Sequence, residues 1–297
     1  MRAFFSRPAL FAVFLPVLCV LPVGCSGPGA SAPAAAGIVS LAPNLTETVY
    51  ALGAGPQVLA VGKFDDWPPE VLAKPKAGGY LDPDLEKITL LNPALIIVPG
   101  QHPKVTEFAK LRGLRVLNVN MDSFATIDAG IRTIGAAVAA EAAAEELVAR
   151  LDGQRAAVAA AVAGLPRPKV LLITQRQSHD LDTLYSAGGP SFVSEITALA
   201  GGENIFADQP QNYFEASKES VVLRAPDVIV EFHCGEKLDD AALAQYRADW
   251  QALATLPAVQ QGRIEMILEP HGLRPGPRII EIARRLAEAL HPGVQIR

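Results

Sequence analysis

The sequence has little cysteine and few aromatic residues. Its 297 residues include three cysteines, Cys19, Cys25 and Cys234, and 6% of the residues are aromatic. The first two cysteines lie in or directly after an apolar segment at the start of the chain. A domain that follows this segment would retain Cys234 alone, which excludes an internal disulfide. It would also lack the several cysteines that a metal-cluster enzyme needs.

The chain also lacks a basic surplus and the common catalytic motifs. Its formal net charge is −5, which gives no positive field for nucleic acid. The sequence contains no H-E-x-x-H, no G-x-S-x-G and no phosphate-binding P-loop. A hydrophobic content of 50% with 19% charge is typical of a folded protein, and the length suffices for one large or two modest domains. These features do not favour an enzyme.

The first 25 residues have the pattern of an export signal. Two arginines precede an apolar run that is too short and too often interrupted by proline for a membrane span. Cys25 follows a glycine, which resembles the lipobox of bacterial lipoproteins, where this cysteine is lipidated; a plain secretory signal is the alternative. Residues 26–37 read SGPGASAPAAAG and are typical of a flexible tether. We therefore expect a periplasmic or extracytoplasmic domain, attached to the membrane only through a lipid on Cys25.

The rest of the chain alternates between short apolar runs and helical patterns. The candidate strands in the first half are a short β-branched run that opens with IVS and ends at Pro43, then QVLAVG, LIIVPG and LRVLNVN; those in the second half are KVLLIT, DVIVEFH and RIEMILE. Strands that alternate with helices indicate parallel sheets covered by helices. The pattern predicts two α/β lobes, in residues 38–140 and 166–297. In the first lobe, Asn44 or Thr46 together with Glu47 is expected to cap the first helix.

A long helix is predicted between the lobes, in residues 141–165. The segment from Glu141 to Gly164 consists almost entirely of strong helix formers and contains no proline. It would be about 36 Å long at about 1.5 Å per residue, enough to run from one lobe to the other. Gly153 is the weakest position in this helix.

One short pattern occurs twice. LEKITLLNPALIIV starts at Leu85 and KESVVLRAPDVIVE starts at Lys218. Each contains a glutamate, Glu86 or Glu219, followed seven residues later by a proline and then by an apolar run. The repetition predicts the same unit in each lobe, a short helix that carries the glutamate and a strand after the proline. The alternative is a chance likeness of two helix–strand units, because helix N-termini favour acidic residues in any case.

Several motifs together resemble a known family. In order they are VSLAPNLTETVYALG, FDDWPPE, GGYLDPDLEKITLLNPALII, YSAGGPSFVSEITALAGGENIFAD, DVIVE and RPGPRIIEIARRLAEALHP. The chain is similar to substrate-binding proteins of bacterial ABC importers, in the subgroup with a rigid helical backbone that captures cobalamin, ferric siderophores and haem. The resemblance extends from about Ile38 to Pro292 and is strongest to the cobalamin receptors. It implies an α/β fold of two Rossmann-like lobes with central, mainly parallel sheets, joined by one long rigid backbone helix, with the ligand cleft between the lobes.

The same resemblance implies a function. The protein would capture a cobalt corrinoid, cobalamin or cobinamide, and deliver it as a monomer to the permease dimer of an ABC importer, with no catalysis and no catalytic cofactor. Glu86 and Glu219 would dock onto arginines of the two permease subunits. Two carboxylates, one on each lobe, suit a partner with two-fold symmetry. Such contacts steer and orient docking more than they add affinity.

Ligand contacts are expected in loops at the carboxyl ends of the strands. Aromatic side chains there could stack on a flat macrocycle, and an arginine could pair with a phosphate or carboxylate or donate to an amide. The resemblance adds two tyrosines and an arginine at positions that face the ligand in the family. The alternative for each aromatic residue is ordinary packing, which we expect for Trp250. The predicted ligand-binding residues are Trp67, Tyr80, Tyr213, Phe232 and Arg274.

Four of the five histidines come within a few residues of the end of a predicted strand: His102, His179, His233 and His271. Neutral imidazole is the commonest protein ligand for transition metals. His233 and His271 are the better candidates for coordinating the cobalt of a corrinoid or the iron of haem, and three histidines together could bind Zn²⁺ directly. The alternative is that these loop histidines are simply solvated.

Other functions therefore remain open. A receptor of the same kind could take a ferric siderophore, haem or a free transition metal, although a siderophore would favour more basic residues than Arg274 alone. A metal-dependent enzyme that uses the cleft histidines is the alternative from another class.

Overall fold

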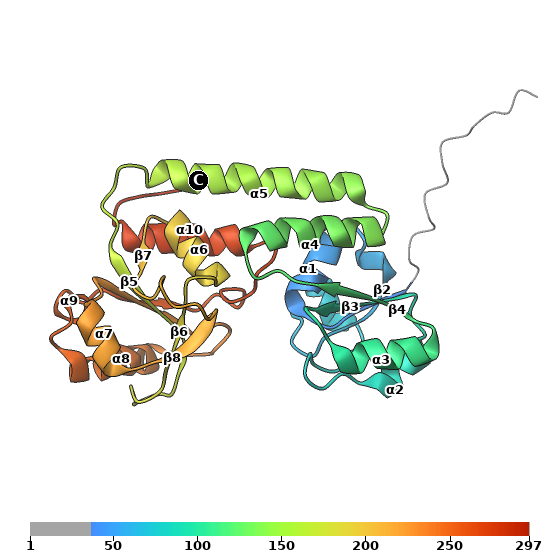
Figure 1. Ribbon diagram of the computed structural model, residues 1–297, viewed down its shortest axis with the longest axis horizontal. Coiled ribbons are helices and arrows are strands. Elements are labelled where there is room, and N and C mark those ends of the chain that lie inside the picture. Colours follow the sequence, from blue (N-terminus) through green and yellow to red (C-terminus); the bar gives the residue numbers. More distant parts are fainter. Residues whose placement is uncertain (1–36, 297) are drawn as a thin grey trace, which may run out of the picture. The chain divides into compact units, whose positions relative to one another are not determined.

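The computed structural model describes residues 37–296, which lie in one compact unit. The predicted export signal, most of the tether and the lipidation site Cys25 lie outside the described residues. Within the described part, two α/β lobes lie side by side and a layer of helices extends over both (Figure 1). None of the helices in residues 37–296 combines the length and the apolar character that crossing a bilayer requires.

The N-terminal lobe is built on a parallel sheet with the strand order β2-β1-β3-β4. Its strands are nearly continuous apolar runs, as is usual for parallel strands that are covered on both faces. The strands are β1 (Ile38–Ser40), β2 (Val58–Val61), β3 (Leu95–Pro99) and β4 (Arg115–Val119). The helices are α1 (Pro43–Ala51), α2 (Leu85–Leu91), α3 (Pro103–Arg112) and α4 (Phe124–Ala137), with 3₁₀ turns η1 (Gly55–Gln57) and η2 (Pro69–Ala73).

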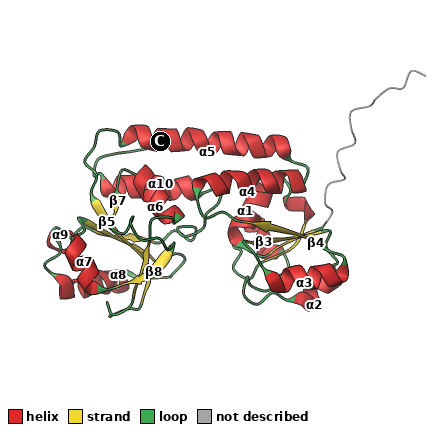
Figure 2. Ribbon diagram, in the orientation of Figure 1, coloured by secondary structure: helices red, strands yellow, loops and turns green. Residues whose placement is uncertain are grey.

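The C-terminal lobe has a mixed sheet with the order β10-β9-β5-β6-β8, and β7 pairs with β5 (Figure 2). Its parallel part confirms the predicted mainly parallel sheet, whereas β6 is antiparallel to both of its neighbours. The strands are β5 (Lys169–Arg176), β6 (Leu184–Ala187), β7 (Glu203–Asn204), β8 (Tyr213–Ala216), β9 (Val228–Phe232) and β10 (Ile264–Ile267). The helices are α6 (Phe192–Leu199), α7 (Lys218–Arg224), α8 (Asp240–Asp249), η3 (Trp250–Leu253), α9 (Pro257–Gln260) and α10 (Ile279–Leu290).

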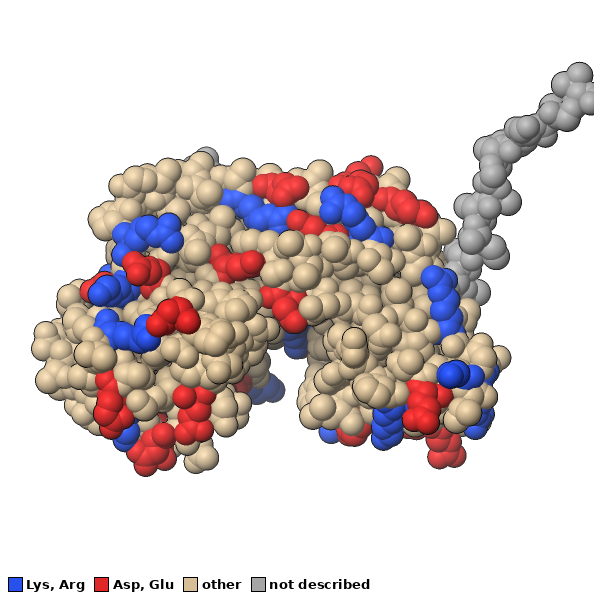
Figure 3. Space-filling model, viewed as in Figure 1, with Lys and Arg blue, Asp and Glu red and all other residues tan. Residues whose placement is uncertain are grey.

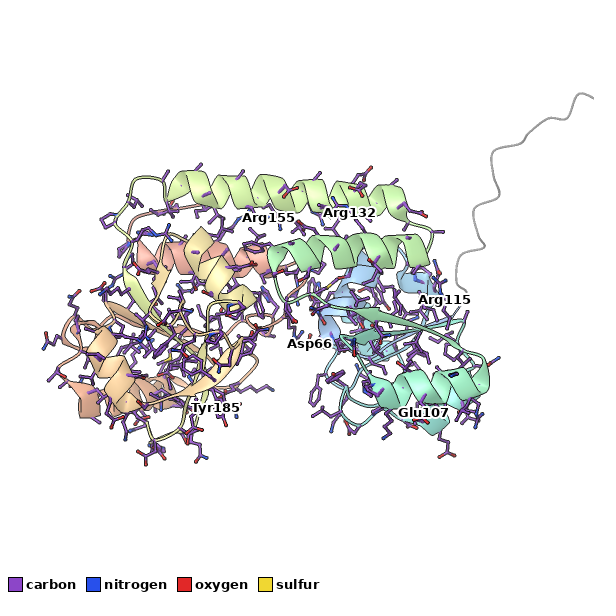
Figure 4. All side chains as sticks on the ribbon, viewed as in Figure 1. Asp66, Glu107, Arg115, Arg132, Arg155 and Tyr185 are labelled. Atoms are coloured by element: carbon purple, nitrogen blue, oxygen red, sulfur yellow. The ribbon has the colours of Figure 1, made fainter. Side chains whose placement is uncertain are left out.

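The predicted long helix is α5, Glu141–Ala161, which passes over both lobes in Figure 1. It ends before the expected Gly164, because the chain turns there with glycine at a φ of +76°. It packs on α4 from the first lobe and on α10 from the second. Arg155 of α5 pairs with Asp128 of α4 at 2.8 Å, and Figure 4 shows Arg155 and Arg132 in the space between these two helices. Helix α5 therefore connects the two lobes through its contacts with both.

One hydrophobic core runs through both lobes. Ile131 of α4, Leu151 of α5 and Leu286 of α10 are completely buried and belong to the same cluster. The other face of each sheet has a smaller cluster of its own. Because the shared cluster crosses from lobe to lobe beneath α5, the connection between the lobes is a packed layer of helices.

The first helix is not capped as its sequence suggests. Ala42 is the N-cap of α1 and makes no side-chain capping bond, so the predicted capping role of Asn44, Thr46 or Glu47 was wrong. Thr46 donates instead to the side chain of Asp65. Asn44 donates to the backbone oxygen of Pro275, and Glu47 accepts from Arg278, so both residues contact the second lobe. These contacts form part of the site described next.

Candidate ligand-binding cleft

A notch separates the two lobes on the side away from α5, as Figure 3 shows. In Figure 4, Asp66 lies at the edge of the first lobe that faces this notch. Asp66 belongs to the loop that leaves the carboxyl end of β2, where ligands of α/β lobes are commonly bound. The two walls of the notch differ in the groups that they present.

The first lobe contributes an apolar hollow of about 240 Å³ at the carboxyl ends of β1 and β2. Phe64, Tyr80 and Leu81 line it and remain 66%, 39% and 85% exposed. Three large apolar side chains exposed in neighbouring loops form the kind of surface that covers a flat ligand. The structure thus places the predicted Tyr80 in the wall and adds Phe64, which the sequence analysis did not single out.

His102 holds Tyr80 in place and has no free ring nitrogen. Its Nε2 donates to the backbone oxygen of Tyr80 at 2.6 Å, and its Nδ1 accepts from the backbone N–H of Val105 at 3.2 Å. The two rings meet edge to face, with centroids 5.1 Å apart. His102 therefore caps α3 and orients the Tyr80 loop.

Asp65 is a buried acid directly behind the hollow. Burial raises the pKa of Asp65 to about 6, against the lowering effect of hydrogen bonds from the Thr46 hydroxyl and the backbone of Gly62. One of its carboxylate oxygens, Oδ1, has no hydrogen-bond partner among the described residues. Asp65 accepts from Thr46 of α1 and so holds the loop after β2 against this helix. Its carboxylate is buried and is not a free charge on the surface of the notch.

The two lobes are joined at the notch by an interlobe ion cluster of Glu47, Asp66, Arg274 and Arg278. Arg278 donates to both oxygens of the buried Glu47, at 2.9 and 2.6 Å. Arg274 donates to both oxygens of Asp66, one of them at 2.9 Å, and lies 3.4 Å from Glu47. The hydrogen bond from Arg274 lowers the pKa of Asp66. The predicted ligand residue Arg274 is thus engaged by a carboxylate of the opposite lobe.

Trp67 lies against this ion cluster. Its ring is 4.9 Å from the guanidinium carbon of Arg278, within the range of a cation–π contact. Trp67 remains 45% exposed and, with Tyr50 and Arg150, lines a second hollow of about 550 Å³ bounded by α1, α5 and the start of α10. The predicted aromatic residue therefore lies at the junction of the lobes, beside the apolar hollow and not within its lining.

Tyr213 faces the first lobe from the second. It begins β8 and is 43% exposed, yet desolvation raises the pKa of its hydroxyl, and the charge of Asp122 from the first lobe raises it further. Because Asp122 belongs to the first lobe, Tyr213 lies on the part of the second lobe that is close to the first.

Phe232 and His233 belong to the interior of the second lobe. Phe232 is buried in the core that the lobes share. His233 Nε2 lies 2.8 Å from Glu231 and its Nδ1 lies 3.3 Å from Glu236. Burial alone would lower the pKa of His233, but these two carboxylates outweigh burial and the pKa is raised. The buried Arg176 donates to the same Glu231 at 3.0 Å, so His233 is part of a closed charged network.

The remaining histidines do not gather into a metal site. His271 accepts from Arg278 through Nδ1 at 3.3 Å, and burial together with the charge of Arg278 lowers its pKa. Its Nε2 lies 3.1 Å from Glu281, without hydrogen-bond geometry. His179 is exposed on the loop after β5. Among residues 37–296, no three side chains of histidine, cysteine, aspartate or glutamate come together as metal ligands.

Two further side chains lie near this network, Trp250 and Cys234. Trp250 is completely buried, as predicted, and its indole N–H donates to Glu231. Cys234 is a half-buried free thiol whose pKa burial raises to about 11, so it is an unreactive small side chain.

The ion cluster contains residues that the sequence analysis did not identify as functional. Glu47, Asp66 and Arg278 come from three separate segments, and Glu47 and Arg278 are 231 positions apart. One signal was present, because FDDW ends a loop of one lobe and RPGPR ends a loop of the other, with opposite charges. This signal becomes specific only when both loops are known to face the same notch.

Comparison with known proteins identifies the family. The family model described as periplasmic binding protein matches residues 38–267. The chain belongs to this family. It is therefore a substrate-binding protein that delivers its ligand to an ABC transporter, and it is not an enzyme.

Individual relatives differ in what they are said to bind. An uncharacterized ABC transporter substrate-binding lipoprotein of Bacillus subtilis is 30% identical over 260 residues, which covers 86% of this chain and 80% of the relative. The vitamin B12-binding protein of Vibrio cholerae is 30% identical over 263 residues, 85% of this chain and 88% of that protein. The structure of a periplasmic heme-binding protein from Roseiflexus, in its apo form, has a TM-score of 0.73 at 26% identity and covers 88% of this chain and all of that one.

Proposed function

We propose that this protein captures a planar, metal-centred macrocycle in the notch, and that the ligand is a cobalt corrinoid such as cobalamin or cobinamide. The observation that carries the proposal is the pair of aromatic walls. Tyr80 and Phe64 are exposed on one lobe and Tyr213 on the other, so a flat ring system between the lobes would have an aromatic face on each side. The vitamin B12-binding relatives at 30% identity support the corrinoid.

In this proposal the corrinoid is held by stacking and by polar contacts from the notch. Arg274 and Trp67 lie where the lobes meet and could reach amide groups at the edge of the macrocycle. His233 and His271 remain the candidates for a cobalt ligand. His233 would first have to leave its carboxylate partners, whereas Nε2 of His271 makes no hydrogen bond with the described residues and only its Nδ1 is engaged, by Arg278. Stacking would supply affinity in either case.

Haem is the second candidate, and the interlobe ion cluster favours it. Arg274 already pairs with a carboxylate, that of Asp66, and a haem propionate is a carboxylate that could take the place of Asp66. The heme-binding relative from Roseiflexus agrees with this possibility. A corrinoid carries amides at its periphery and would leave the Arg274–Asp66 pair intact.

Delivery would use the two glutamates of the repeated units. Glu86 lies in the first turn of α2 and Glu219 in the first turn of α7, one on each lobe. We propose that they pair with basic groups of the two permease subunits, and that Cys25 carries the lipid that keeps the receptor, a monomer, at the membrane. Paired carboxylates set the orientation and the rate of encounter.

The test is a titration of the purified protein with cobalamin, cobinamide, haem, a ferric siderophore and Zn²⁺, followed by tryptophan fluorescence and visible absorbance. We expect saturable binding of a corrinoid, weakened on the order of tenfold by either Tyr80→Ala or Tyr213→Ala because each removes one stacking face. Leu111→Ala is the control, since Leu111 is an exposed apolar side chain on α3 that lines neither hollow.

The remaining outcomes separate the candidates. Binding of haem in place of corrinoids, with loss of affinity in Arg274→Ala, would reject the corrinoid and support haem. Equal weakening by Leu111→Ala and Tyr213→Ala would show that the notch is not the site.

A further inference from the structure

Two short helices expose the same surface on the two lobes. Helices α2 and α7 both have an N-cap side chain that accepts from the backbone N–H three residues later, a left-handed residue at the C-cap, and a strand that follows a proline. A glutamate lies two residues after each N-cap and a leucine lies six residues after it. The equivalent pairs are Asp84 and Ser217, Glu86 and Glu219, Leu90 and Leu223.

Helix geometry puts each glutamate and its leucine on one outward face. Positions four apart differ by about 40° around a helix, whereas the position between them lies on the opposite side. That middle position is Ile88 in α2 and Val221 in α7, and both are completely buried. The leucines are largely exposed, Leu90 to 81% and Leu223 to 86%.

We propose that Leu90 and Leu223 are apolar anchors of the docking surface, each entering a pocket on one subunit of a two-fold permease, beside the group that pairs with the glutamate. This inference rests on the proposed delivery function and extends it to a second pair of residues. One chain displays the same face twice, and the partner that fits is one that has the same site twice, as a symmetric dimer does.

Charge complementarity selects the permease over a second copy of this chain. If α2 or α7 packed against the same face of another copy, the contact would bring two glutamates near each other, and the adjacent Lys87 and Lys218 already pair with Asp84 and Asp182 of their own chain. A partner with a basic group beside an apolar pocket satisfies both members of each pair. The leucine side chain supplies apolar area that stabilises the contact once water is excluded from it.

The two residue types have different kinetic roles. Exposed carboxylates act at a distance and mainly raise the association rate, an effect that salt screens. Burial of a leucine acts only after contact, so it slows dissociation and depends little on salt. Removing one leucine should weaken docking roughly 10- to 100-fold, the effect expected for exposing one such side chain again.

The experiment measures binding of the purified protein to the complete importer of the same organism, permease and ATPase subunits, in lipid nanodiscs by biolayer interferometry. Leu90→Ser and Leu223→Ser should each raise the dissociation rate about tenfold or more, and the double variant should show the product of the two effects because the sites are far apart. Glu86→Gln with Glu219→Gln should lower the association rate at low salt. Leu72→Ser is the control, since Leu72 is 66% exposed on the first lobe and lies outside both helices.

The outcomes distinguish this inference from the proposed function. If the glutamate variants weaken docking but the double leucine variant dissociates like the parent protein, the leucine anchors are rejected and the delivery function stands. If the parent protein does not bind the importer, both are rejected. If sedimentation shows that the parent protein dimerises and that Leu90→Ser with Leu223→Ser abolishes the dimer, the occupant of this face is a second copy and the inference is overturned.

Discussion

At the scale of single residues, the most consequential feature is a buried carboxylate whose counter-charge comes from the other lobe. Glu47 is 4% exposed, and its two oxygens accept from Arg278. A buried ion pair adds little net stability compared with well-packed apolar residues, but a buried charge without its partner is costly. The free energy of burying Glu47 in the first lobe therefore depends on where the second lobe holds Arg278.

Arg278→Met should destabilise the protein by up to about 3–5 kcal/mol, because it leaves the buried charge of Glu47 with only the longer contact to Arg274, at 3.4 Å. The free energy of unfolding in urea is the measurement. Arg285→Met is the control on α10, which begins directly after Arg278, since Arg285 pairs with Glu265 at 3.5 Å with both side chains about one-third exposed. That surface pair should contribute less than about 1 kcal/mol. Equal losses in the two variants would mean that the Arg278–Glu47 contact does not persist in solution.

At the scale of secondary-structure elements, α5 illustrates how a helix can connect two lobes. Its sequence is rich in alanine and lacks proline, so local propensity alone favours a helix over Glu141–Ala161. Its buried positions then meet one helix from each lobe. Gly153 is exposed, and a Cβ built there would meet nothing within 4 Å.

Gly153→Ala should stabilise the protein by about 0.5–1 kcal/mol, since alanine reduces the backbone entropy lost on folding and fits without contact. Thermal unfolding followed by circular dichroism measures this. Gly164→Ala provides the contrasting control, because its site is equally open but has a φ of +76°. There the added Cβ is strained and should cost about 1–2 kcal/mol. A destabilised Gly153→Ala variant would show that α5 is bent or packed at that position.

The elements also show where reading the sequence succeeds and where it fails. The apolar runs of β3, β5 and β9 and the repeated helix–strand unit were predicted from local pattern alone, because burial on both faces gives a strand a recognisable composition. The strands β6 and β8 were not predicted. Each has only four residues, and the 25 residues between Ala187 and Tyr213 exceed any ordinary hairpin turn.

At the scale of the whole described molecule, one core extends through α4, α5 and α10. A boundary between independent domains would have few packed residues across it. Here buried side chains such as Ile131, Leu151 and Leu286 join the lobes. Movement of one lobe against the other would disturb this packing, so ligand capture should involve only small displacements.

The two lobes should therefore unfold in one cooperative transition. Differential scanning calorimetry should show a single peak whose calorimetric and van't Hoff enthalpies agree. Saturation with the ligand should raise the midpoint of the whole transition, because a ligand that binds the notch stabilises both lobes at once. Two separate peaks, or a ligand shift of only one of them, would contradict the shared core.

The sequence by itself determined the α/β character, the long helix and the repeated unit with Glu86 and Glu219. Each of these depends on periodicity or propensity within a few turns of the chain. The partners of the polar side chains were decided only by the tertiary structure. Arg274 was expected at the ligand and pairs with Asp66, and His233 was expected to have a free nitrogen and has two carboxylates. The physical reason is that a polar group takes whichever partner its buried surroundings provide, and those surroundings are assembled from segments far apart in the chain.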